Sequence, residues 1–225
     1  MPKITPLVKN LIIINLLFFF FSSIASTPGS IMHDIDQLLP VYHPSSSMFR
    51  PWQIITHMFM HGSFRHILFN MFGLFFLGST LERFWGPKRF ITYYMVAGLG
   101  GLFLQTGVNA YLYYDAIGTA FPLASELPDG LAYAFTHSNM RGASGAVFGL
   151  LLAFGYLFPN TPLYLFFIPI PIKAKYFVIG YGLIELFSGF SNSSGDMVAH
   201  FAHLGGMLFG FILLVIWQKK RDKFY

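Results

Sequence analysis

A serine with glycines on both sides is the first residue whose setting suggests chemistry. Ser144 lies in the run Arg-Gly-Ala-Ser-Gly at residues 141–145, directly before a short apolar segment. Neighbouring glycines let another backbone approach closely, and the positive end of a helix dipole stabilises negative charge that develops on a serine there. The sequence therefore offers Ser144 as a candidate nucleophile. The alternative is an N-cap serine in a small-residue packing motif.

Two histidines near the carboxyl end are candidate bases. His203 lies three residues before Gly206, and Gly206 and Gly210 form a Gly-x-x-x-Gly pair that permits close helix contact. Residues three apart share a helix face, so we expect His203 to press against a neighbouring helix, where a neutral imidazole can act as a general base. His200 competes for this role, but the register of the two glycines favours His203. A buried histidine bonded to a carbonyl is the alternative.

A third polar group comes just before and within an apolar segment. It contains His57, His61, His66 and Asn70, and the last two are four residues apart, so they share a helix face. An imidazole and an amide aimed at one point are suitable donors for a developing oxyanion. A metal site is the alternative, because His57 and His61 have ligand-like spacing. Zinc usually needs three or four protein ligands, and no acidic residue or cysteine lies close by, so we expect no metal and no cofactor.

No Asp or Glu is placed by its sequence position to orient His203. Asp196 comes seven residues earlier and is expected to lie in a loop. A nucleophile, a base and oxyanion donors without such a carboxylate predict a Ser144–His203 dyad. Packing would then orient the imidazole in place of a carboxylate.

The composition indicates that membrane helices position these residues. Of the 225 residues, 55% are hydrophobic and 10% are charged, whereas soluble domains carry roughly 25% charged residues. The absence of cysteine from the sequence excludes disulfides, thiolate chemistry and cysteine-based metal sites. A net charge of +5 could suggest nucleic acid, but the basic residues are distributed as membrane topology requires, so we expect no nucleic-acid partner.

Six apolar stretches reach, or nearly reach, the length of about 20 residues that a bilayer-spanning helix needs. They predict one all-α membrane domain over residues 1–225, with spans at 8–25, 64–84, 90–110, 144–158, 176–190 and 198–217. The first stretch follows Lys3 and Lys9, so it also resembles a signal peptide.

The segments between the spans contain many prolines. Residues 27–62 are too apolar for a free linker and too interrupted for a span, so we expect a loop that lies in the membrane interface. Residues 158–175 contain four prolines, each of which can end a helix because proline lacks a backbone donor.

The basic residues predict the orientation of the helices. With a cytoplasmic N-terminus, eleven of the fourteen Lys and Arg residues fall on the cytoplasmic side, and Arg50, Arg65 and Arg141 fall outside. Positive charge marks the cytoplasmic side, so six spans place both termini in the cytoplasm. We expect a multi-pass protein of the cell (inner) membrane. Removal of the first stretch as a signal would leave five spans in the same orientation.

Four motifs of this sequence resemble the rhomboid family of intramembrane proteases, over residues 50–215. In order, they are His66-Ile-Leu-Phe-Asn70, Leu77-Gly-Ser-Thr-Leu-Glu82-Arg-Phe-Trp-Gly86, Gly142-Ala-Ser144-Gly145 and Ala202-His203-Leu-Gly-Gly206. The resemblance implies a six-helix bundle with Ser144 as nucleophile and His203 as base. It also implies an oxyanion hole made by Asn70, His66 and the Ser144 backbone, with His61 as the family's additional histidine. The implied reaction is peptide hydrolysis in or beside a transmembrane helix of another protein, so transmembrane proteins and the lipid bilayer are the expected partners.

Two positions depart from the family's pattern. The Trp-Arg of the first loop is Trp52-Gln53 here, and the aromatic residue four after the nucleophile, often tyrosine, is Phe148. The family's arginine is structural, so its replacement concerns stability more than catalysis. Phe148 can still stack on His203. We also expect Glu82 to tie the end of the second helix to the third.

Two other functions stay open. A catalytically inactive relative that binds membrane proteins would not need both Ser144 and His203. A transporter or channel would use His66, His61 and Glu185 as a proton path, and Glu185 within the fifth apolar stretch is the feature that favours it.

Overall fold

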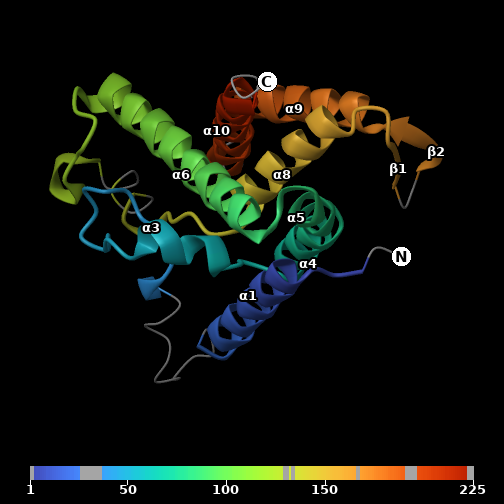
Figure 1. Cartoon of the computed structure of the whole chain (residues 1–225). Coiled ribbons are helices and arrows are strands. Elements are labelled where there is room, and N and C mark those ends of the chain that lie inside the picture. Colours follow the sequence, from blue (N-terminus) through green and yellow to red (C-terminus); the bar gives the residue numbers. More distant parts are fainter. Residues whose placement is uncertain are drawn as a thin grey trace.

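The computed structural model of the chain is mostly helical (Figure 1). It describes residues 3–25, 37–128, 132, 135–165, 168–190 and 197–221. The helices are α1 (Pro6–Ala25), α3 (Gln53–Thr56), α4 (Phe64–Gly73), α5 (Ser79–Trp85), α6 (Pro87–Ile117), α8 (Ser144–Leu157), α9 (Ala174–Phe190) and α10 (Met197–Arg221). Short turns of 3-10 helix cover His57–Phe59 and Ala124–Glu126.

Three helical segments of the described chain have the length and apolar composition to cross a membrane. They are Phe64–Trp85, Pro87–Ile117 and His200–Lys219. Pro6–Ser22 and Ser144–Leu157 are apolar helices of shorter length. The count of six spans and the position of residues 27–62 in the membrane interface stay predictions.

The second predicted span is helical throughout but changes its winding in the middle. Ser63 starts it, and its hydroxyl accepts the backbone N–H of His66 at 3.1 Å. A π-helical turn at Leu74–Gly78 separates α4 from α5. Such a turn has one more residue than an α-helical turn. It therefore rotates the side chains of α5 relative to those of α4.

The third helix is longer than the sequence indicated. It was expected at 90–110, but α6 runs from Pro87 to Ile117 and ends at Gly118, whose φ of 80° closes the helix in the left-handed region. Its last two turns carry tyrosines and Asp115. These residues are less apolar than the rest of the helix, so the sequence did not indicate that the helix continues beyond residue 110. Proline at the first position fits the start of α6 because the missing N–H is not needed there.

The all-α expectation was wrong for one segment. Strands β1 (Pro162–Leu165) and β2 (Ile168–Lys173) form an antiparallel pair, with Leu163 opposite Ile172. Prolines end helices but are tolerated in edge strands, and both strands of a two-stranded sheet are edges. The alternation of isoleucine with proline in β2 has the period of two that a strand needs.

Helix α8 lies at the centre of the helix packing (Figure 1) and contacts α4, α5, α6, α9 and α10. Its contact with α10 is made by backbone. A Cβ atom on Gly206 would stand only 1.9 Å from the carbonyl oxygen of Gly145. On the α6 side, the buried Tyr93 hydroxyl donates to the Gly149 carbonyl at 2.9 Å. These contacts fix the position of α8 along its axis relative to α10 and α6.

Glu82 ties α5 to α1, so the expectation that it joins the second helix to the third was wrong. Its buried carboxylate accepts the Thr5 hydroxyl and the backbone N–H groups of Leu7 (3.2 Å) and Val8 (2.9 Å). Leu7 and Val8 belong to the first turn of α1, whose N–H groups have no partner inside the helix. A negative charge at that end also suits the helix dipole.

Candidate active site

Ser144 is the first residue of α8. The residue before it, Ala143, occupies the N-cap position, and no side chain caps this helix end. The alternative of an N-cap serine is therefore wrong. The first backbone N–H groups of an α-helix have no carbonyl partner within it, so those at the start of α8 can donate to a group bound beside Ser144.

The segment that leads into Ser144 is held against the first loop by backbone hydrogen bonds. Met140 exchanges two such bonds with Val41, at 2.8 and 3.0 Å. The N–H of Gly142 donates to the His57 carbonyl at 2.8 Å. Gly142 has a φ of +133°, and a Cβ there would stand 2.7 Å from the His66 ring. Only glycine fits this position, which explains one of the two glycines flanking the serine.

His203 lies flat on Phe148. The ring centroids are 4.0 Å apart and the planes differ by 6°, which confirms the stacking expected from the sequence. Phe148 follows Ser144 by one helical turn, and Gly206 brings α10 against Gly145, so the imidazole lies beside the first turn of α8. The hydrogen bonds of the described residues include none between Ser144 Oγ and His203. Such bonds are often long before substrate binds.

A buried carboxylate holds the other edge of His203. Nδ1 of His203 lies 3.0 Å from Oε2 of Glu185 on α9, and Nδ1 of His200 lies 2.6 Å from the same oxygen. The expectation that no acidic residue orients His203 was therefore wrong. The one signal in the sequence was an ionisable residue inside an apolar stretch.

The same three side chains are the group that could hold a metal ion among the described residues. Glu185, His200 and His203 each offer one donor atom, and these three atoms lie within 4.8 Å of one another. Two imidazoles and a carboxylate are a ligand set that zinc accepts. The imidazole–carboxylate hydrogen bonds also satisfy these atoms without an ion. The sequence also offered His57 and His61 as possible metal ligands. His57 Nδ1 instead donates to the Gln53 carbonyl at 2.9 Å.

His66 and Asn70 lie on the face of α4 that meets α8. His66 borders Gly142, and a Cβ on Gly73 would stand 2.6 Å from Val147 Cγ1. The two helices therefore run in the same direction, and Asn70, between His66 and Gly73, lies near the level of Ser144. Its amide donates to the His66 carbonyl at 3.1 Å, which leaves a second N–H for another acceptor.

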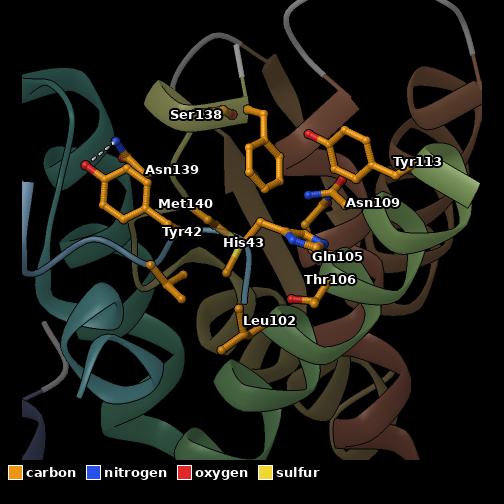
Figure 2. Close-up of a pocket in the computed structure, with 12 residues that line it drawn as sticks. Tyr42, His43, Leu102, Gln105, Thr106, Asn109, Tyr113, Ser138, Asn139 and Met140 are labelled. Atoms are coloured by element: carbon orange, nitrogen blue, oxygen red, sulfur yellow. Dashed lines mark hydrogen bonds between the residues drawn. The ribbon is translucent and has the colours of Figure 1, made fainter. Parts of the chain in front are cut away.

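A separate pocket is lined in part by Ser138, Asn139 and Met140 of the segment that leads into Ser144 (Figure 2). It encloses about 40 Å³ between α6, the first loop and residues 135–140, and its lining includes neither Ser144 nor His203. Figure 2 shows His43, Gln105 and Asn109 pointing into it. His43 Nε2 and Gln105 Oε1 are buried without a hydrogen-bond partner among the described residues. Unpaired polar atoms in a space of this size suit bound water.

Residues 49–220 match the sequence model of the Rhomboid domain. The chain belongs to the rhomboid family. The rhomboids are integral membrane proteins, and the family includes serine proteases.

Several other rhomboids are similar to this one. "RHOMBOID-like protein 12, mitochondrial" of Arabidopsis thaliana is 34% identical over 76% of this chain and 48% of its own length. "Rhomboid protein 1, mitochondrial" of Saccharomyces cerevisiae is 29% identical over 76% of this chain and 44% of its own. "Rhomboid protease GluP" of Bacillus subtilis is 29% identical over 71% of this chain and 25% of its own. The aligned part thus spans about half or less of these three relatives.

This rhomboid holds its first loop with an amide where the family resemblance leads one to expect arginine. The Gln53 side chain is fully buried. Its Oε1 accepts the Arg50 N–H at 3.0 Å, and its Nε2 donates to the carbonyls of Leu38 (3.2 Å) and Met48 (3.0 Å). One side chain therefore joins three points of the loop, so the departure at this position leaves a structural role in place.

Proposed function

We propose that this rhomboid is an intramembrane serine endopeptidase with Ser144 as nucleophile and His203 as general base. The supporting observation is the flat stack of His203 on Phe148, one turn beyond Ser144, at a helix start where backbone contact joins α8 to α10. This arrangement places the imidazole beside the helix turn that begins with Ser144, whose hydroxyl caps nothing. A serine with an imidazole base close by is the pairing that an activated nucleophile requires.

The reaction follows from these groups. His203 takes the proton of Ser144 Oγ as Oγ attacks the carbonyl carbon of the scissile peptide bond. The resulting oxyanion accepts hydrogen bonds from Asn70, His66 and the Ser144 N–H. His203 then gives its proton to the leaving amine, the C–N bond breaks, and water hydrolyses the acyl-enzyme by the same route.

The proposal includes a membrane topology. We place the chain as one membrane domain with six spans, both termini in the cytoplasm and the loop of residues 27–62 in the membrane interface. The cell (inner) membrane is the proposed location. The substrates are then transmembrane proteins cut within or next to a spanning helix, since the site is built among apolar helices. The unequal distribution of lysine and arginine supports this orientation.

A fluorophosphonate probe and a cleavage assay test the proposal together. Purified wild-type protein should react with the probe, and Ser144→Ala should not. Co-expression with a panel of single-span membrane proteins should yield cleavage that requires Ser144. A folded wild type that neither reacts with the probe nor cleaves any member would overturn the assignment in favour of a catalytically inactive binder.

One observation weakens the alternative of a proton path through His66, His61 and Glu185. Burial, and secondly the neighbouring charge of His66, lowers the pKa of His61 to about 3. An imidazole with such a pKa stays neutral near pH 7, so it does not take up a second proton there. Glu185 bonds to the two histidines of α10.

A further inference from the structure

Glu185 is a buried carboxylate whose two observed partners are both imidazoles. It is 6% exposed and lies on α9, and its Oε2 accepts Nδ1–H from His203 at 3.0 Å and from His200 at 2.6 Å. An ionised carboxylate inside a bundle of apolar helices is costly unless it is paired. A carboxylate kept beside His203 despite this cost therefore indicates a functional role for Glu185.

Stacking alone leaves the orientation of His203 undecided. Phe148 fixes the plane of the ring, with 6° between the two planes. A ring turned over by half a rotation would stack equally well, but it would exchange the positions of nitrogen and carbon atoms. Stacking also does not decide which nitrogen carries the proton. A hydrogen bond at one nitrogen decides both.

Glu185 supplies that hydrogen bond. Because its Oε2 accepts a hydrogen bond from Nδ1–H, Nε2 of His203 keeps a free lone pair with which to take the Ser144 proton. Once His203 is doubly protonated, the carboxylate also stabilises the positive charge. His200 Nδ1–H donates to the same oxygen, which helps to keep the carboxylate turned toward His203.

Building on the proposed function, we propose that Glu185 is a positioning residue that completes a Ser144–His203–Glu185 triad, with His200 anchoring the carboxylate. The site is then a triad drawn from helices α8, α10 and α9. It replaces the dyad that the sequence predicts.

The test compares Glu185→Gln with Glu82→Gln, which makes the same chemical change at another buried carboxylate, the one that caps α1. Assays contain EDTA, so that no ion occupies the donor atoms of Glu185, His200 and His203. Glu185→Gln should lower kcat by about 10²-fold or more, as the loss of base orientation does in other triads. KM and the melting temperature should change little, and fluorophosphonate labelling should slow by a similar factor.

Glu185→Asp keeps the charge and should recover part of the lost kcat. Glu82→Gln should lower the melting temperature and leave kcat per folded molecule intact.

The outcomes separate this inference from the proposed function. A Glu185→Gln protein with wild-type kcat, while Ser144→Ala is inactive, would overturn the triad and leave the protease assignment standing. A loss that only follows the fraction of folded protein, as in the Glu82 control, would overturn it as well. A wild type that does not react with the probe would overturn both proposals.

Nitrogen NMR of histidine-labelled wild-type protein tests the same point even if Glu185→Gln fails to fold. The expected result is a His203 ring with its proton on Nδ1. A His203 ring with its proton on Nε2 would overturn the triad, because that nitrogen could not then accept the serine proton.

Discussion

At the scale of single residues, the Ser144 hydroxyl can be removed at little structural cost. It sits at the start of α8 but does not cap it, because Ala143 holds the N-cap position. Ser144→Ala should therefore abolish proteolysis and probe labelling, with the melting temperature in detergent almost unchanged. Activity near the wild-type level would remove Ser144 from the nucleophile role.

The two histidines of α10 should differ sharply in their importance. His203→Ala should be as damaging as Ser144→Ala, and the double mutant no worse than either, because groups that act as one unit are not additive. His200→Ala should be milder, since the hydrogen bond of His200 within the described part of the chain goes to the Glu185 carboxylate and not to Ser144. Cleavage rates of the four proteins decide this. An inactive, folded His200→Ala beside an active His203→Ala would assign the base to His200.

Asn70 should contribute mainly to the transition state. Asn70→Ala should lower kcat more than it weakens substrate binding, and loss of one oxyanion donor typically costs about 10²–10³ in rate. Its amide also bonds to the His66 carbonyl, so a purely structural role makes a different prediction. In that case the melting temperature would fall and kcat per folded molecule would stay. Both quantities are to be measured on one preparation.

The sequence pointed to Ser144 and His203 because their signals are local. A flanking glycine and a Gly-x-x-x-Gly register can be seen within a few residues. Glu185 gave no such signal for orienting His203. It precedes His203 by 18 residues and sits on another helix, so its role depends on how α9 is rotated against α10, which no spacing rule specifies.

At the scale of elements, one carboxylate of α5 contributes to the attachment of α1, beside the apolar packing of Val8 and Leu11. Glu82→Ala removes the acceptor for three donors at the start of α1. Hydrogen bonds to charged groups are worth about 1.5–3 kcal/mol each, so the free energy of unfolding should fall on the order of 2 kcal/mol or more. Unfolding in SDS measures the change. Unaltered unfolding, or a loss of kcat in molecules that remain folded, would contradict a purely structural role.

Helices were easier to predict than their ends and interruptions. Long apolar runs specify α4–α5, α6 and α10 because burial in lipid needs about 20 apolar residues. The end of α6 is not apparent from the sequence because its final turns are polar and aromatic. Strands β1 and β2 are not apparent because proline indicates the end of a helix more clearly than the presence of an edge strand. The π-helical turn at Leu74–Gly78 leaves no pattern in the residue types, since Leu-Phe-Phe-Leu is an ordinary apolar helix segment and glycine is frequent in membrane helices.

At the scale of the whole molecule, two buried histidines of the first loop should make stability depend on pH. Burial lowers the pKa of His57 to about 4 and that of His61 to about 3, the latter also through the charge of His66. In the unfolded chain both take up protons near pH 6.5. The unfolded state therefore binds more protons below that pH, and stability is full above about 6.5 and falls as the pH drops toward 4.

The expected loss between pH 7 and pH 5 is on the order of 2 kcal/mol for each histidine. Unfolding in SDS at the two pH values measures it. His57→Gln keeps a donor for the Gln53 carbonyl but cannot titrate, so it should lose about half of the pH dependence. A variant with the same pH dependence as wild type would show that His57 does not contribute.

The contact between Gly145 and Gly206 also bears on how the protein meets lipids of different thickness. Membranes that are thinner or thicker than a helix's apolar length make it change its tilt. Here α8 and α10 touch through their backbones, with no room even for one added carbon. Neither helix can tilt toward the other, so we expect the two to tilt as one body. The distance between Ser144 and His203 should then stay the same in bilayers of different thickness. The outer helices would change their tilt instead.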